Sequence, residues 1–107
     1  MTQLKPMRVI LFFDLPTVTK KEKKLATKFR QMLLNSSFTM LQWSIYTRYC
    51  KNNDGAEQVI ASLNQILPPV GNIRVLKVTE KQFDNIILLL GKKKKQEKII
   101  GDQLILF

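Results

Sequence analysis

The sequence predicts an α+β domain in which two helices cover one face of an antiparallel sheet. Three observations predict it. An unbroken apolar run at residues 9–13 is typical of a central strand. Two longer segments, 20–35 and 54–67, carry apolar residues at helical spacing. Between them lie short stretches that are rich in aromatic and β-branched residues, as strands are.

The first predicted strand ends on a lone carboxylate. Asp14 comes directly after the apolar run and stands before Leu15 and Pro16. Because a strand buried on both faces is a continuous apolar run, we expect residues 9–13 in the middle of the sheet and Asp14 at its end. A metal ion or a phosphate could reach the carboxylate there. The alternative is that Asp14 only accepts backbone hydrogen bonds in the turn before a helix.

A capping box marks the start of the first helix. The Thr19 hydroxyl and the Glu22 carboxylate can each accept a hydrogen bond from a free backbone amide at the helix start. The helix is expected to end near residues 35–37. The apolar residues along it form one stripe at helical spacing: Leu25, Phe29, Met32 and Leu33.

The next segments are predicted to be strands. Residues 38–49 form either two short strands broken near Gln42 and Trp43 or one long bent strand, because aromatic and β-branched residues are frequent there. A turn at Gly71 leads into a further predicted strand at residues 73–78.

Two more helices are expected after turns. Asp54 and Glu57 are candidates to cap a second helix, which two consecutive prolines stop. A capping box that begins at Thr79 predicts a short third helix closed by Gly91. The apolar run at residues 86–90 within it is equally compatible with a strand.

The resulting order of strand, helix, strand, strand, helix and strand is that of the ferredoxin-like fold, a βαββαβ antiparallel sheet with two helices on one face. We expect a single such domain over residues 1–107, with residues 1–6 as a short N-terminal extension. Residues 92–107 are expected to form a lysine-rich loop and a last strand. Because an exposed apolar edge invites pairing with another chain, residues 99–107 are predicted to be exchanged in a homodimer.

The charge balance indicates a nucleic-acid partner. Eighteen Lys and Arg residues against eight Asp and Glu residues give a formal charge of +10, which attracts phosphate backbones whatever their sequence. The apolar runs are far shorter than the roughly 20 residues that span a bilayer, and no secretion signal opens the chain. We therefore expect a soluble, cytoplasmic protein without a membrane partner.

Two basic segments are candidates for phosphate contacts, which position a duplex without reading its sequence. The first helix carries Lys20, Lys21, Lys23, Lys24, Lys28 and Arg30. The loop after the third helix carries Lys92, Lys93, Lys94 and Lys95. The alternative for both segments is a solvated surface. Arg48, Arg74 and Lys77 are predicted on strands, where they either face phosphate or pair with carboxylates.

Several catalytic chemistries are excluded by composition. The chain has no histidine and one cysteine, so it lacks the commonest general base and any zinc site of Cys and His type. Ser44 and Tyr46 have no evident activating group, so packing is the expected role. Trp43 could stack on a base, but the Gly-aromatic pattern of an RNA recognition motif is absent. Cys50 is expected to be a small buried hydrophobe.

Three segments together resemble one family. They are Asp14-Leu15-Pro16-Thr17-Val18-Thr19 after an apolar strand, Gln42-Trp43-Ser44-Ile45-Tyr46, and residues 71–83. In this order and spacing they resemble the small CRISPR-associated adaptation protein, the Cas-two family. The Val-Thr-Glu-Lys-Gln-Phe stretch at residues 78–83 resembles its type II branch. The resemblance covers residues 7–107.

The resemblance implies two activities. The first is that of a ferredoxin-like homodimer, which sits between two dimers of the CRISPR integrase and holds duplex prespacer DNA while its ends are inserted into the repeat array. The second is magnesium-dependent cleavage of single-stranded RNA or duplex DNA. In the family this cleavage is ascribed to the Asp of the first strand, which implies that Asp14 is the Mg²⁺ ligand and catalytic residue of each subunit.

The residues favour the first activity. Phosphodiester hydrolysis with Mg²⁺ needs hard oxygen ligands, and Asp14 is the single carboxylate predicted at its strand end. In a two-fold dimer, two copies of Asp14 could face each other across the axis. The sequence therefore predicts a DNA-holding role ahead of a nuclease, with a generic basic RNA-binding module as a third hypothesis.

Overall fold

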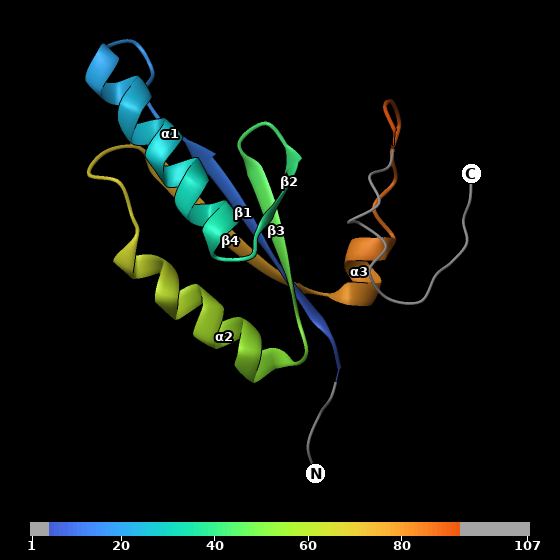
Figure 1. Ribbon diagram of the computed structural model, residues 1–107. Helices are drawn as coiled ribbons and strands as arrows, with labels where there is room; N and C mark the ends of the chain where they lie inside the picture. The colour runs from blue at the N-terminus through green and yellow to red at the C-terminus, as the bar shows by residue number, and fades with distance from the viewer. Residues whose placement is uncertain (1–4, 93–107) are drawn as a thin grey trace.

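The computed structural model describes residues 5–92, which form an antiparallel sheet with two helices packed on one side of it (Figure 1). The elements in chain order are β1 (Met7–Asp14), α1 (Lys20–Asn35), β2 (Thr39–Gln42), β3 (Ile45–Cys50), α2 (Asn53–Ser62), the 3₁₀ turn η1 (Leu63–Gln65), β4 (Asn72–Thr79) and α3 (Glu80–Asp84). The predicted α+β class and element order are confirmed. Lys93, Lys94, Lys95 and the predicted C-terminal strand at 99–107 lie outside the described residues, as do residues 1–4.

β1 lies in the middle of the sheet, whose strand order is β2-β3-β1-β4. It pairs antiparallel with β3 on one side and with β4 on the other. Because successive side chains of a strand point to opposite faces, Val9, Leu11 and Phe13 pack with the helices in the core. We call the side of the sheet that carries α1 and α2 the helix face and the opposite side the open face.

The core lies between the helix face and the two helices. Phe13 makes an edge contact with Phe29 of α1, with ring centroids 5.2 Å apart, and a tilted contact with Tyr46 of β3 at 5.6 Å. β1 is buried from Met7 to Leu11, but Phe12 on the open face is 37 % exposed. The expected burial of both faces is therefore wrong at Phe12.

Both ends of α1 are determined by local sequence. At the start, Thr19 and Glu22 make the predicted capping box, with both reciprocal hydrogen bonds present. At the end, Ser37 adopts the left-handed backbone conformation with φ 68°. The backbone N–H of Phe38 donates to Leu33 and that of Ser37 to Leu34, which is a Schellman motif. Phe38 and Leu33 are both buried, so the motif also supplies the apolar contact that fixes the path into β2.

The cap of α2 differs from the prediction. The Asn52 side chain, rather than Asp54, accepts the hydrogen bond from the helix start, at 2.8 Å from the backbone N of Gly55. Glu57 is not part of the cap, because it forms an ion pair with Lys77 of β4. Asn and Asp are about equally good at this position, so sequence preference alone does not choose between neighbours.

The third helix is shorter than predicted. α3 ends at Asp84, where the backbone N–H of Asn85 donates to the carbonyls of its last turn. Residues 86–90 are exposed and form neither the expected helix closed by Gly91 nor a strand. A short helix depends on packing for its stability, and exposed apolar residues have none.

A buried ion pair anchors α3 to the open face at the far end of β1 from Asp14. Arg8 is 1 % exposed and Glu80 is 4 % exposed. The guanidinium donates from Nε to Glu80 Oε1 at 2.9 Å and from Nη2 to Oε2 at 2.6 Å, while Nη1 donates to Thr47 Oγ1 at 3.4 Å. The Phe83 ring lies 4.3 Å from Arg8 Cζ. The bidentate pair and the ring together fix where the chain leaves the sheet.

We expect Glu80→Ala to lower the free energy of unfolding by about 3–5 kcal/mol, because it leaves the buried Arg8 charge without its partner. The measurement is urea denaturation at one fixed protein concentration. Glu57→Ala is the matched control, since its ion pair with Lys77 is more exposed and should contribute less than about 1 kcal/mol. Equal losses in the two variants would contradict a structural role for the Arg8 pair.

Candidate nucleic-acid interface

Asp14 is the last residue of β1 and lies on the open face, opposite Asn72 of β4. It is exposed. Within residues 5–92, no hydrogen bond or ion pair of the Asp14 carboxylate is found, so the alternative in which it only stabilises its own turn is not borne out. Among the residues that the structure describes, none occupies the carboxylate.

Asp14 offers one carboxylate as a hard oxygen ligand. In the part of the chain that the structure describes, no three His, Cys, Asp or Glu side chains are grouped so as to hold a metal ion. Mg²⁺ is nevertheless often held by one or two carboxylates, with water and substrate phosphates as the remaining ligands. Asp14 is therefore compatible with a shared or partly hydrated Mg²⁺ site, and the described residues of one chain do not make a complete site around it.

Glycine is required where β4 begins beside Asp14. Gly71 has φ +113°, and a Cβ there would lie 2.9 Å from the Asp14 carbonyl oxygen and 2.5 Å from Leu15 Cδ2. Only a residue without a side chain allows the two backbone segments to approach this closely. The approach fixes the backbone that carries the Asp14 carboxylate.

The basic side chains of α1 form two rows along the helix. Residues three, four and seven apart share a helix face, so Lys21, Lys24 and Lys28 form one row, directed away from the buried stripe. Lys20, Lys23 and Arg30 form a second row along the flank. All five lysines are exposed, as predicted.

The charge of these rows is not neutralised within the helix. Glu22 is the single acidic residue of α1, and its carboxylate already accepts the hydrogen bonds of the capping box. The hydrogen bond from the Thr19 backbone N–H lowers the pKa of Glu22, with a further contribution from Val18. Glu22 thus stays charged, but one carboxylate against the six basic side chains of α1 leaves the helix strongly positive, which favours phosphate binding.

Arg30 differs from the lysines of its row because it is not simply solvated. Its Cζ lies 4.1 Å from the centroid of the Trp43 ring and 5.4 Å from that of Phe13. Arg30 Nε is buried and, within residues 5–92, has no hydrogen-bond partner. The guanidinium is thus within cation–π distance of two aromatic rings.

The three basic residues predicted on strands have separate environments. Arg48 Nη1 donates to the Ser36 carbonyl oxygen at 2.8 Å, and so holds the end of α1. Lys77 forms an ion pair with Glu57. Pairing with a carboxylate was one of the two alternatives predicted for it. Arg74 is exposed and lies opposite Phe12 on the open face, close along β4 to Asn72, the residue opposite Asp14. Lys92 is exposed at the end of the described chain.

The residues that were not expected to act as nucleophiles have structural positions. Tyr46 is part of the core, and Ser44 occupies the β2–β3 turn with φ 68°. Cys50 is buried, and this burial raises the pKa of its thiol. A thiol with a raised pKa is a poor nucleophile, so these residues give no support for covalent catalysis.

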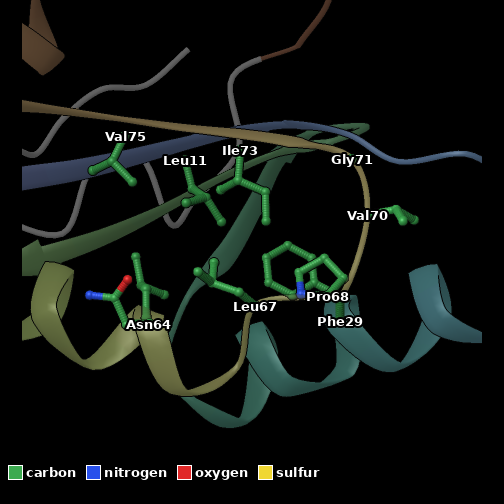
Figure 2. A pocket seen from close by; sticks show the side chains of 10 residues that line it. Leu11, Phe29, Asn64, Leu67, Pro68, Val70, Gly71, Ile73 and Val75 are labelled. Atoms are coloured by element: carbon green, nitrogen blue, oxygen red, sulfur yellow. The ribbon is translucent and has the colours of Figure 1, made fainter.

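The hollow on the helix face is apolar. It has a volume of about 310 Å³ and lies between β4, the turn after α2 and the loop that follows (Figure 2). Leu11, Ile73 and Val75 line it from the sheet, and Leu67 and Phe29 from the opposite side. No Lys or Arg side chain from residues 5–92 lines it, so the described lining offers no cation for a phosphate.

Several contacts of the described chain were not predicted from the sequence, and two of them place an arginine beside an aromatic ring. One is the Arg8–Glu80 pair, for which the signal was an Arg at the start of an otherwise apolar strand. The other is the stacking of Arg30 on Trp43. Each joins elements that only the tertiary fold brings together.

Comparison with known proteins decides the family. The model of the family described as CRISPR associated protein Cas2 matches residues 7–86. The chain belongs to the Cas2 family. This confirms the resemblance carried by the three segments, and the described part of the Cas2 chain contains no helix long and apolar enough to cross a membrane.

Relatives from several bacteria are similar over most of the chain. A CRISPR-associated endoribonuclease Cas2 from Campylobacter jejuni is 53 % identical over 91 residues, which are 85 % of this chain and 64 % of that protein. Proteins of the same name from Flavobacterium psychrophilum and Streptococcus mutans are 40 % and 46 % identical, over 100 % and 81 % of this chain and 93 % and 80 % of their own lengths.

A solved structure supports the fold. The structure described as "Crystal structure of cas2" matches with a TM-score of 0.55 and covers 94 % of this chain and 99 % of its own. At 16 % sequence identity, the match bears on the fold alone. It agrees with the α+β architecture of this Cas2 chain.

We expect Gly71→Ala to destabilise the protein by about 1–3 kcal/mol, because alanine is strained at this φ and its Cβ would meet backbone atoms. Urea denaturation measures the loss. Gly55→Ala is the control, since Gly55 lies in α2 without a left-handed φ and an added Cβ there comes no closer than 3.4 Å to a neighbour. If both variants were as stable as the parent, the close approach beside Asp14 would not constrain the fold.

Proposed function

We propose that this chain holds duplex prespacer DNA during CRISPR spacer acquisition, as a homodimer bound by the integrase that inserts the DNA ends into the repeat array. The observation that carries this proposal is the set of exposed lysines on α1, which no acidic residue of the helix neutralises. Lysines spaced along a helix contact successive phosphates of a backbone and need no particular base sequence. Membership of the Cas2 family supports the CRISPR context.

The formal charge of +10 supports a long contact with nucleic acid. A single binding pocket would not need charge on this scale. Each lysine that neutralises a phosphate releases counterions, so the affinity for duplex DNA should fall steeply as the salt concentration rises. In this proposal, the protein positions the duplex and the integrase catalyses the insertion of its ends.

A homodimer through the open face is part of the proposal. Phe12 is 37 % and Leu76 is 49 % exposed on neighbouring strands of this face. Residues 86–90, which follow α3, expose five consecutive apolar side chains. Large exposed apolar patches mark interaction sites in soluble proteins. A second copy, related by a two-fold axis, would cover it with the same residues.

A metal-dependent nuclease is the second candidate, and the free Asp14 carboxylate favours it. Two copies paired through their open faces would bring two Asp14 residues to one interface. Mg²⁺ bound there would polarise a phosphate and activate water. Asp14 would hold the metal, and the lysines of α1 would hold the flanking strand. The names of the relatives, CRISPR-associated endoribonuclease Cas2, are consistent with cleavage of RNA.

Spacer acquisition in cells separates the two candidates. We expect Asp14→Ala to leave acquisition at the parental level, because a DNA-holding dimer does not use the carboxylate. We expect a variant with Lys20, Lys21, Lys23 and Lys24 changed to Glu to abolish acquisition, because the duplex then meets repulsive charge. Sequencing of the repeat array measures new spacers.

The controls address folding and charge. Both variants must be folded dimers of parental size. A variant with Lys5, Lys51 and Lys81 changed to Glu reverses exposed charges elsewhere and should retain much more acquisition. Loss of acquisition in Asp14→Ala alone would place the carboxylate in the mechanism and refute the purely DNA-holding role.

We expect Phe12→Asp combined with Leu76→Asp to convert the dimer into monomers, because two charges per chain would be buried in the interface. Sedimentation velocity at micromolar concentration measures the change in mass. Val18→Asp is the control, since Val18 is 85 % exposed but follows β1 in the loop before α1 and is not part of the open face. A dimer that persists in the double variant would locate the interface elsewhere.

A further inference from the structure

Trp43 is an exposed side chain on a turn that is hydrogen-bonded to β1. It lies in the turn between β2 and β3 and is 71 % exposed, which is unusual for the largest apolar side chain. The turn is attached to the end of β1, because the backbone N–H of Phe13 donates to the Ser44 carbonyl oxygen at 3.1 Å. An indole on such a turn is pre-positioned and loses little freedom when a partner binds.

Arg30 occupies one face of the indole. Its Cζ lies 4.1 Å from the Trp43 ring centroid and 5.4 Å from the Phe13 ring centroid. The contacts form a stack of Phe13, Arg30 and Trp43 that begins in the core and ends in water. A flat, exposed ring with a cation beneath it is an arrangement that accepts a further planar group.

The charge around the stack indicates what kind of planar group would bind there. Lys20 and Lys23 lie in the same row of α1 as Arg30. Lys23 is seven residues before Arg30, two helical turns or about 10 Å along the axis. The only acidic residue of α1, Glu22, is engaged in the capping box. A planar ligand that also carries negative charge at intervals is a strand of nucleic acid.

We propose that Trp43 is a stacking site for an unpaired base of single-stranded DNA or RNA, with Lys20 and Lys23 as contacts for the phosphates of the same strand. Bases inside a duplex have both faces covered, so the site takes a single-stranded end or overhang. Stacking on an aromatic side chain tolerates any base, because every base has a π face. The proposal extends the proposed function, since it adds the single-stranded part of the substrate to the duplex that the lysines hold.

Trp43 is the only tryptophan of the chain, so its emission reports on this site alone. The experiment titrates the full-length protein with 15-nucleotide oligothymidine, oligouridine and a blunt DNA duplex. Trp43 emission and the anisotropy of a labelled strand are followed together. We expect both single strands to quench Trp43 as they bind, and the duplex to bind without quenching.

Two substitutions test the contribution to affinity. We expect Trp43→Leu, which keeps an apolar side chain but removes the ring, to weaken single-strand binding about 5- to 100-fold. Its dependence on salt should stay unchanged, because no charge is lost. Trp43→Phe should bind within a few-fold of the parent, since a smaller ring remains. Lys23→Gln should reduce the slope of log affinity against log salt by about 0.7, the value for one phosphate of a single strand.

Unchanged Trp43 emission in the presence of saturating single strand, together with parental affinity of Trp43→Leu, would overturn the proposal and leave the exposed indole as a contact for protein. Quenching by only one of the two single strands supports the site and shows which of the two strands it prefers. The blunt duplex decides the proposed function separately, because that function requires the duplex to bind whether or not Trp43 stacks on a base.

Discussion

The fold depends on the register of β1. This strand is hydrogen-bonded to β3 on one side and to β4 on the other. In the described sheet, β1 and β3 are the strands with two neighbours, and β2 and β4 lie at the edges. Its alternation sends Phe13 to the core and Asp14 to the open face. Because side chains alternate with a period of two, a slip of one residue would place the carboxylate against the helices and Phe13 in water. The candidate metal ligand and the base of the aromatic stack are thus adjacent residues held in place by one ladder of hydrogen bonds.

Local signals in the sequence predicted the parts of the fold that are determined locally. The boxes that begin at Thr19 and Thr79 cap α1 and α3 as expected, because each is complete within four residues. The extent of α3 was not predictable, since residues 86–90 have helical spacing but are exposed rather than packed against the described sheet and helices. The exposed lysines of α1 followed from helical periodicity. The stack of Arg30 on Trp43 did not, because it requires the β2–β3 turn to lie beside α1.

The two candidate activities differ in how many residues each depends on. In the proposed DNA-holding role, phosphate binding would be shared among five exposed lysines in two rows, so the loss of any one would remove a fraction of the affinity. Metal chemistry would depend on a single carboxylate per chain, whose position is fixed by the close approach of Gly71. A surface that holds DNA therefore tolerates change residue by residue, whereas a nuclease centred on Asp14 would not. This difference in tolerance is itself a physical distinction between the two roles.

The burial of Cys50 has a practical consequence. It is the only cysteine of the chain, it lies in the core, and burial raises the pKa of its thiol. Maleimides and methanethiosulfonates react with thiolates, so this thiol competes poorly with an exposed one at neutral pH. A cysteine introduced on the surface would take up a spin label or fluorophore selectively in the native background. Distances between two such probes would then report how copies of the chain are arranged on a bound strand.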